Sequence, residues 1–159
     1  MIPPRISYFL TDMFRRYPTA LVAGSYPLHL YVGSHYSDID VFVSDASLDA
    51  NMLNFFSTQG MIIETTYTGE NYEGEAIYKT FRFGIYNLIV IYDDYFNNYI
   101  DTFDLDICKV IIDNRLNVIA TPVAEDVFNS GICVYTGVCD SRLYKYQSRF
   151  PEINFIEVQ

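Results

Sequence analysis

The stretch that most constrains the fold runs from Leu21 to Val43, where two apolar segments flank a glycine-serine turn and a pair of acidic residues. Residues 20–24, ALVAG, are short and apolar and predict a buried strand. In the segment SDIDVFV, side chains alternate between the two faces of a predicted strand, so Asp38 and Asp40 share one face. Their Cα atoms then lie about 6.5–7 Å apart, which is two residue rises.

Two carboxylates this close repel each other unless a cation lies between them. Oxygen ligands of this kind suit Mg²⁺ or Mn²⁺. The alternative is a pair of surface aspartates at the start of an edge strand. The D-x-D pattern of Asp38 and Asp40 does not by itself decide between a metal site and an exposed edge.

The turn before the acid pair favours phosphate binding. Gly24 has no Cβ, so a ligand can approach the backbone closely at this position. Ser25 offers a hydroxyl and a backbone N–H, and a helix that begins here attracts an anion to its N-terminus. A phosphate cradle that faces a metal-binding acid pair is what phosphoryl or nucleotidyl transfer requires.

Gly24-Ser25, a gap of twelve residues and then Asp38-Ile39-Asp40-Val41 resemble the signature of the DNA polymerase β-like nucleotidyltransferase superfamily. The resemblance is close over residues 20–43 and loose up to about residue 115. It is strongest to stand-alone nucleotidyltransferase-like proteins of viruses and phages and to the head domain of tRNA CCA-adding enzymes. It implies that Gly24 and Ser25 hold a nucleoside triphosphate, and that the acid pair holds two metal ions together with a third acid from a neighbouring strand.

The position of that third acid is open. The strand-like segment IYNLIVIY offers only Asn87, which is neutral and a poorer metal ligand. FDLDICKV is expected to form a strand beside DIDVFV, with Asp104, Asp106 and Cys108 on one face. We favour Asp104 as the third acid and metal ligand, with Asp106 next. The alternative is that Asp104 caps a turn or forms a salt bridge.

Basic residues are few, and the net charge is −10. A surface this acidic repels nucleic acid. If the protein acts on RNA or DNA, it therefore needs a local basic patch or a metal ion. Lys79 and Arg82, on a predicted strand, are candidates for contact with a triphosphate or for a plain surface role. Arg142, Lys145 and Arg149 share one face of a predicted helix, which either contacts phosphate or is simply solvated.

The elements predict one mixed α/β domain over residues 1–159, with a central β-sheet flanked by helices. The segment FDLDICKVIID and the later NVIA are expected to pair around the turn NRL. GENYEGE is expected to be a loop, and SRLYKYQSRF the terminal helix. The other predicted helices lie near residues 4–17, 27–32, 47–60, 93–102 and 121–131, and the other strands near 61–68, 76–84, 87–92 and 132–137.

Composition narrows the class of protein further. No apolar run approaches the roughly 20 residues of a membrane span, and the N-terminal residues lack a secretory apolar block, so we expect a cytosolic protein without a membrane partner. Three cysteines and two histidines without C-x-x-C spacing argue against a disulfide framework or a zinc site.

Two functions follow from this reading. The first is a metal-dependent nucleotidyltransferase that moves NMP, by preference AMP, from an NTP to a hydroxyl on RNA, protein or a small molecule, with Mg²⁺ or Mn²⁺. The second is a catalytically inactive binding protein of viral origin, in the host cytoplasm, that keeps the fold and engages a nucleotide or a host partner. Asn87 and the lack of an Arg after Gly24-Ser25, where Leu28 and His29 stand, favour the second.

Overall fold

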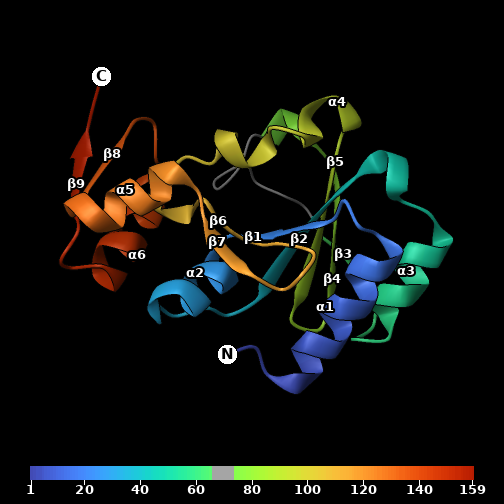
Figure 1. The fold of residues 1–159 in the computed structure, drawn as a ribbon. Coiled ribbons are helices and arrows are strands. Elements are labelled where there is room, and N and C mark those ends of the chain that lie inside the picture. Colours follow the sequence, from blue (N-terminus) through green and yellow to red (C-terminus); the bar gives the residue numbers. More distant parts are fainter. Residues whose placement is uncertain (66–73) are drawn as a thin grey trace.

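The computed structural model describes residues 1–65 and 74–159. Figure 1 shows a central sheet with helices packed on both sides. The helices are α1 (Pro4–Arg16), α2 (Ser25–Val32), α3 (Ala50–Ser57), α4 (Asp93–Phe96), α5 (Pro122–Ser130) and α6 (Asp140–Arg149). The strands are β1 (Leu21–Ala23), β2 (Ile39–Ser44), β3 (Ile63–Thr65), β4 (Ile77–Phe83), β5 (Tyr86–Ile91), β6 (Val110–Ile112), β7 (Val118–Ala120), β8 (Ile132–Tyr135) and β9 (Asn154–Glu157).

Seven strands form the central sheet in the order β3-β4-β5-β2-β1-β6-β7. The pair β2–β5 is parallel and the other pairs of this sheet are antiparallel. A second sheet holds only the parallel pair β8–β9. The prediction of a mixed α/β fold with a central sheet flanked by helices is confirmed.

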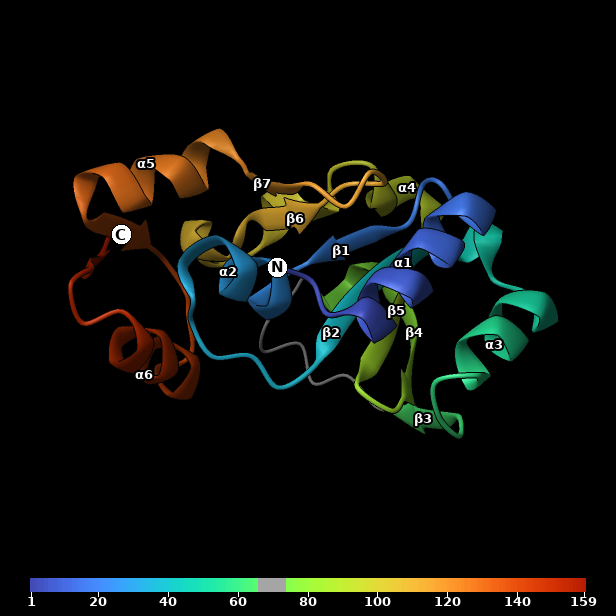
Figure 2. The same ribbon diagram turned by 60° about the horizontal axis from the view of Figure 1, so that its bottom comes forward.

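Each face of the sheet has its own core. The side chains of Ile39, Val41 and Val43 pack on the face that α1 and α3 cover. Phe42 and Ile89 belong to a second core with residues of α5 and α6 on the opposite face. Figure 2 shows α5 and α6 gathered at one end of the sheet and α1 and α3 at the other. Because side chains alternate along β2, Asp40 shares the face of Phe42.

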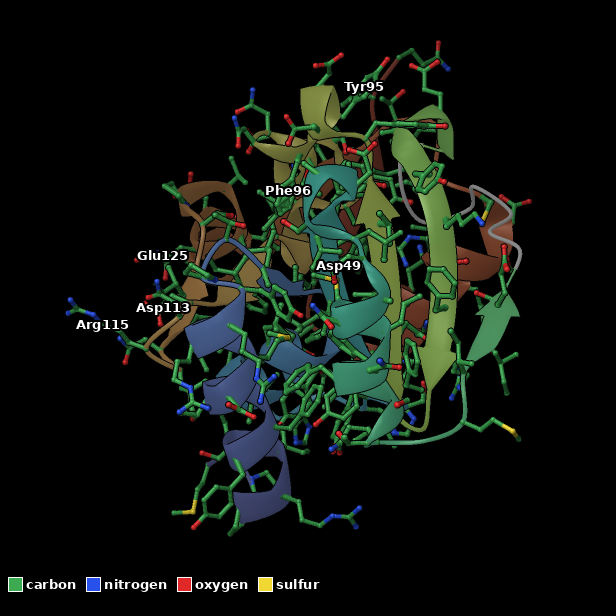
Figure 3. All side chains as sticks on the ribbon, turned by 90° about the vertical axis from the view of Figure 1, so that its right-hand side faces the viewer. Asp49, Tyr95, Phe96, Asp113, Arg115 and Glu125 are labelled. Carbon is green, nitrogen blue, oxygen red and sulfur yellow. The ribbon has the colours of Figure 1, made fainter. Side chains whose placement is uncertain are left out.

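Local signals explain the element ends that the sequence predicts well. Thr121 caps α5 by accepting the N–H of Ala124, and Gly131 ends it in the left-handed region at φ 75°. Asp49 caps α3 in the same way at 2.9 Å from the nitrogen of Met52. In the β6–β7 turn, Asp113 accepts two backbone N–H groups at 2.8 and 2.9 Å. These hydrogen bonds, that of Asn117 first, hold the pKa of Asp113 below its usual value. Figure 3 labels Asp49 and Asp113.

One predicted strand is wrong in a way that matters for the site. Of FDLDICKVIID only β6 is a strand, and it pairs with β1 and β7 rather than with β2. Asp106–Cys108 forms a 3₁₀ turn, closed by hydrogen bonds from the nitrogens of Cys108 and Lys109 to carbonyls three residues earlier. In this turn Leu105, Ile107 and Cys108 are all buried.

Other differences are smaller. The strand β9 follows the helix that was expected to be terminal, and it pairs with β8. Asp93 is the first residue of α4, and its carboxylate accepts a hydrogen bond from the hydroxyl of Ser44 at 2.6 Å. Most of the predicted loop GENYEGE, and the end of the predicted strand before it, lie outside the described residues. Among the described residues, no helix combines the length and the apolarity needed to cross a membrane.

Candidate functional site

Strand register builds one wall of the site. Asp40 in β2 lies opposite Asn87 in β5, and Asn87 lies opposite Arg82 in β4. These three side chains therefore form a row across one face of the sheet. The Asn87 amide donates a hydrogen bond to Oδ1 of Asp40 at 2.9 Å. The guanidinium of Arg82, on β4, lies 3.7 Å from Oδ2 of Asp38 and forms an ion pair with it.

The glycine-serine turn lies beside this row because Ala23, the last residue of β1, pairs with Asp40. Gly24 then turns the chain with φ 90° and ψ −141°, a conformation that favours glycine because it has no Cβ. α2 begins at once with Ser25, and the carbonyl of Gly24 accepts the N–H of Leu28. The turn thus presents Ser25 and the start of a helix next to the acid pair, as the sequence predicts.

α6 supplies the opposite wall. Arg142, Lys145 and Arg149 all line the same cavity, which agrees with their predicted common face. Arg142 is 7% exposed, and its Nε donates to both carboxylate oxygens of Asp104, at 2.8 and 3.0 Å. Nη1 of Arg149 is buried without a hydrogen-bond partner among the described residues. A buried guanidinium nitrogen without a partner is costly, and an anion in the cavity would satisfy it.

The cations of α6 also affect one another. Partial burial, followed by the charges of Arg149 and Arg142, holds the pKa of Lys145 below its usual value. Bringing three like charges together on one helix face is unfavourable without a counter-ion. Arg142 has Asp104 for this purpose, whereas no ion pair is recorded within the described ranges for Lys145 or Arg149. This wall is therefore prepared for an anionic ligand.

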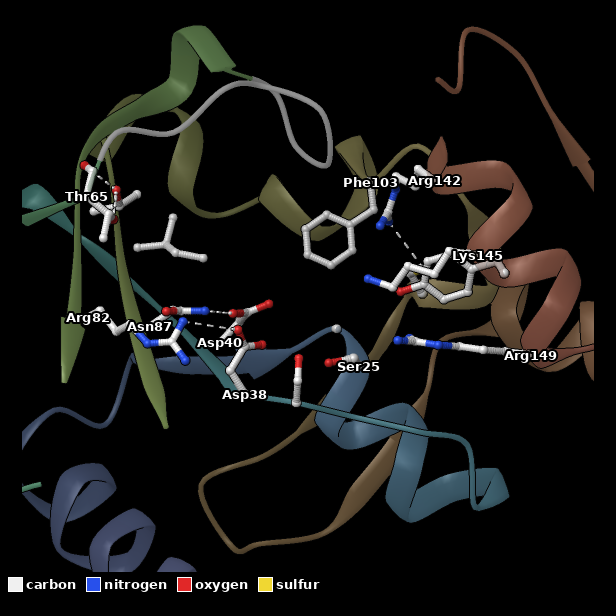
Figure 4. A pocket seen from close by; sticks show the side chains of 16 residues that line it. Ser25, Asp38, Asp40, Thr65, Arg82, Asn87, Phe103, Arg142, Lys145 and Arg149 are labelled. Carbon is white, nitrogen blue, oxygen red and sulfur yellow. Dashed lines mark hydrogen bonds and ion pairs between the residues drawn. The ribbon is translucent and has the colours of Figure 1, made fainter. Parts of the chain in front are cut away.

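The two walls enclose a cavity of about 330 Å³, within the range of small-molecule sites. Figure 4 shows the acid pair and Ser25 between Arg82 on one side and the α6 cations on the other. Four of the protein's ten Lys and Arg residues line it, against two carboxylates. The lining residues are Gly24, Ser25, Ser37, Asp38, Asp40, Thr65, Thr80, Arg82, Asn87, Ile89, Phe103, Cys108, Arg142, Lys145, Tyr146 and Arg149.

The cavity brings together Gly24, Ser25, Asp38, Asp40 and Arg82, all expected at the site from the sequence. It does not include three other expected residues. Asp104 is held by Arg142, and Asp106 pairs with Lys109 at 2.8 Å. Lys79 points from the other face of β4 and lies 3.7 Å from Glu64. Nδ1 of His29, one of the residues that stand where an Arg was expected, lies 2.6 Å from the carbonyl oxygen of Ser34 and hydrogen-bonds to it.

The expectation that Asp104 or Asp106 converges with the acid pair is therefore not met. The physical reason for this difference is the 3₁₀ turn at Asp106–Cys108. Because of this turn, neither Asp104 nor Asp106 lies on a strand beside β2. Within residues 1–65 and 74–159, no group of three or more acidic, histidine or cysteine side chains is placed to hold a metal ion. Asn87 occupies the position opposite Asp40 at which a third carboxylate would complete such a group.

The remaining donor set fits one divalent ion. Mg²⁺ is commonly held by one or two carboxylates together with substrate phosphates, and Asp38 and Asp40 supply two. Two ions between the same pair of acids would need further negative ligands, which the described side chains around the pair do not provide.

Sequence reasoning missed several lining residues. Thr65 and Thr80 face each other across β3 and β4, with their hydroxyl oxygens 2.6 Å apart. Phe103, Cys108 and Tyr146 close the cavity beneath the α6 cations. Burial raises the pKa of the Cys108 thiol and of the Tyr146 hydroxyl, so both stay protonated at neutral pH. The sequence held one signal that Thr80 faces the cavity: it stands two residues before Arg82 on the same strand, and residues two apart share a face.

The arrangement as a whole defines a nucleotidyltransferase-like fold, with a glycine-serine turn and a D-x-D strand on one sheet face. No protein-family model matches the sequence, and a comparison with curated proteins finds no match. Solved structures do match. The Thermotoga maritima CCA-adding enzyme complexed with tRNA has a TM-score of 0.63 and 14% identity, over 99% of this chain and 40% of that chain.

A second matching structure is a complex of a CCA-adding enzyme with CTP, with a TM-score of 0.64 and 14% identity, over 99% of this chain and 41% of that one. A tRNA-processing enzyme in an apo form matches with a TM-score of 0.55 and 10% identity, over 85% and 37%. The chain thus spans about two fifths of the length of these structures. The likeness shows that the fold resembles the nucleotidyltransferase head of CCA-adding enzymes.

The Arg142–Asp104 pair gives a first test of how the site is built. Asp104→Asn leaves the buried guanidinium without its counter-charge, so we expect the free energy of unfolding to fall by about 3 kcal/mol in metal-free buffer. Asp12→Asn is the matched control, because its partners Arg15 and Arg16 are exposed and the loss should be under about 1 kcal/mol. Urea denaturation measures both. An unchanged stability in Asp104→Asn would contradict a structural role for this carboxylate.

The lowered pKa of Lys145 gives a second test. The ammonium form attracts an anion and the neutral amine does not, so affinity for tripolyphosphate should fall as the pH rises through that lowered pKa. Lys145→Gln should bind more weakly at neutral pH and lose this decline. Arg149→Gln should bind more weakly but keep it, since a guanidinium stays charged. Calorimetric titration measures the tripolyphosphate affinity across the pH range. An equal decline of affinity in Lys145→Gln would show that another group causes the pH dependence.

Proposed function

We propose that the cavity binds a nucleoside triphosphate together with Mg²⁺ or Mn²⁺ and transfers its nucleoside monophosphate to an acceptor hydroxyl. The supporting observation is the single cavity that joins the start of α2, the acid pair and the α6 cations. Each of the three elements matches one requirement of the reaction: donors for the phosphates, carboxylates for an ion, and positive charge for the leaving pyrophosphate.

The residues divide the work by position. Ser25 and the first N–H groups of α2 bind phosphate oxygens, and Lys145 and Arg149 neutralise the far end of the triphosphate from the other wall. Asp38 and Asp40 would hold the ion, which when bound aligns the attacking oxygen and withdraws charge from the phosphate. The acceptor oxygen bonds to the α-phosphorus, the bond from that phosphorus to the bridging oxygen breaks, pyrophosphate leaves, and the hydroxyl proton passes to water.

The acceptor is an RNA, a protein or a small molecule, and the fold favours RNA. Two of the matching structures are CCA-adding enzymes in complex with tRNA and with CTP. In this chain the net charge of −10 means that RNA must be attracted locally, and Arg82, with an exposed side chain on the rim, can supply such a contact. A cytosolic location stays a prediction.

A second candidate function is a nucleotide-binding protein without transfer, including one of viral origin that engages a host partner. The observation in its favour is Asn87, which binds Asp40 where a third carboxylate would stand. The anion-binding wall of α6 does not depend on Asn87, so nucleotide binding survives under either function.

Separate measurements of binding and transfer test the proposal. Wild type is incubated with each labelled NTP, Mn²⁺ and, in turn, total RNA, protein and small-molecule acceptors, and NTP affinity is measured independently. We expect Asp40→Asn to abolish transfer and to weaken metal–NTP binding. Ser25→Ala should weaken NTP binding by roughly 1.5–3 kcal/mol at most, since it removes one hydrogen bond to a charged group. Glu125→Gln, an exposed residue of α5, is the matched charge control and should behave as wild type.

The outcomes separate the two functions. NTP binding without transfer to any acceptor would favour the binding protein. No NTP binding even with Mn²⁺ would overturn both and assign the function to another surface.

Metal binding has its own test. Divalent ions that bind only the folded state stabilise it by mass action. Mn²⁺ should therefore raise the melting temperature of wild type and of Glu125→Gln, but not that of the double variant Asp38→Asn/Asp40→Asn. An equal rise in the double variant would show that the ion binds elsewhere on this acidic surface.

A further inference from the structure

Asn87 is the direct neighbour of the acid pair on the next strand of the sheet. It lies directly opposite Asp40 on the parallel strand β5, and its side chain reaches the same face of the sheet. Its amide donates to Oδ1 of Asp40 at 2.9 Å, so it adds a donor and no negative charge at this position. Arg82 places a positive charge 3.7 Å from Asp38. The acid pair is thus already contacted by an amide from β5 and by a guanidinium from β4.

Among the described residues, the negative charge around the acid pair is that of two carboxylates, which is too small for two divalent ions. Asp38 and Asp40 contribute two negative charges, and within the described residues no third carboxylate joins them. Mg²⁺ and Mn²⁺ need negatively charged oxygen ligands to offset the loss of hydration, and two ions a few ångströms apart also repel each other. One ion that shares both carboxylates and a phosphate oxygen meets these requirements.

The opposite wall supplies the charge that a second ion would otherwise bring. Lys145 and Arg149 line the cavity from α6, and Nη1 of Arg149 is buried without a partner among the described residues. Arg142 is already neutralised by Asp104. Two cations that have no ion pair within the described residues therefore face the acid pair across the cavity (Figure 4).

We propose that this site takes one divalent ion, shared by Asp38 and Asp40, and that Lys145 and Arg149 neutralise the triphosphate in place of a second ion. The inference rests on the proposed nucleotide binding and deepens it. Asn87 is the positioning residue that limits the number of ions. Arg149 and Lys145 determine specificity for a triphosphate over a monophosphate.

The number of bound ions is measured with Mn²⁺ and an NTP whose α–β bridging oxygen is replaced by a methylene group. Wild type should bind one Mn²⁺ per nucleotide and show the electron paramagnetic resonance spectrum of an isolated ion. Asn87→Asp adds the missing charge and should bind two ions with a spin-coupled spectrum, since paired ions lie about 3.5–4 Å apart. Asn87→Ala, the matched control, removes the amide without adding charge and should still bind one.

The cation wall has a separate readout. Lys145→Gln and Arg149→Gln should each weaken binding of the NTP analogue by about tenfold or more and leave NMP binding nearly unchanged. Arg115→Gln, in the exposed β6–β7 turn, is the control and should change neither.

Each contrary result has a distinct meaning. Two coupled ions in wild type, or one ion in a folded Asn87→Asp, would overturn the one-ion inference and leave nucleotide binding intact. Equal losses for NTP and NMP in the α6 variants would overturn the role of Lys145 and Arg149. Failure of wild type to bind the analogue would overturn the proposed function itself, and this inference with it.

Discussion

The parallel pairing of β2 with β5 is the contact on which the site depends. β2 lies in the middle of the sheet, with β1 on one side and β5 on the other. The β1 register places the Gly24 turn beside Asp40, and the β5 register places Asn87 across from it. Because side-chain direction alternates along a strand, a slip of one residue in either pairing would move the acid pair into the α1–α3 core. The apolar residues on either side of Asp40 resist this slip, since Ile39 and Val41 are fully buried.

Electrostatics connects this sheet to the C-terminal helix. The protein is strongly acidic, yet the cavity gathers four of its cations around two carboxylates. Holding them there has an electrostatic cost, which the fold offsets where Arg82 pairs with Asp38 and where Asp104 binds Arg142 through both carboxylate oxygens. Arg142 in turn packs over the ring of Tyr146, with its guanidinium carbon 4.9 Å from the ring centroid. This buried pair anchors α6, so Lys145 and Arg149 face the acid pair with no ion pair of their own in the part of the chain that the structure describes.

Features that depend on neighbouring residues were predictable from the sequence. The helical spacing of α1, the Thr121 cap and the Gly24-Ser25 turn are all local, and all agree with the structure. Asp38 lies one residue before β2 rather than in it, yet it lines the same cavity as Asp40. The third acid could not be located in this way, because strand pairing is a long-range choice. FDLDICKV alternates like a strand, but it contains a 3₁₀ turn at Asp106–Cys108, and only the residues after it join the sheet. The role of Asn87 likewise became visible only through its register with Asp40.

The central claim is that a nucleotide binds between the α2 turn and α6 with a divalent ion at the acid pair. A crystal structure of the protein with Mn²⁺ and a non-hydrolysable NTP tests it most directly. Anomalous scattering should show manganese between the carboxylates of Asp38 and Asp40. The triphosphate should extend from Ser25 towards Arg149, with an oxygen bonded to the now unpartnered Nη1. A nucleotide outside this cavity, or manganese bound only away from the acid pair, would contradict the account.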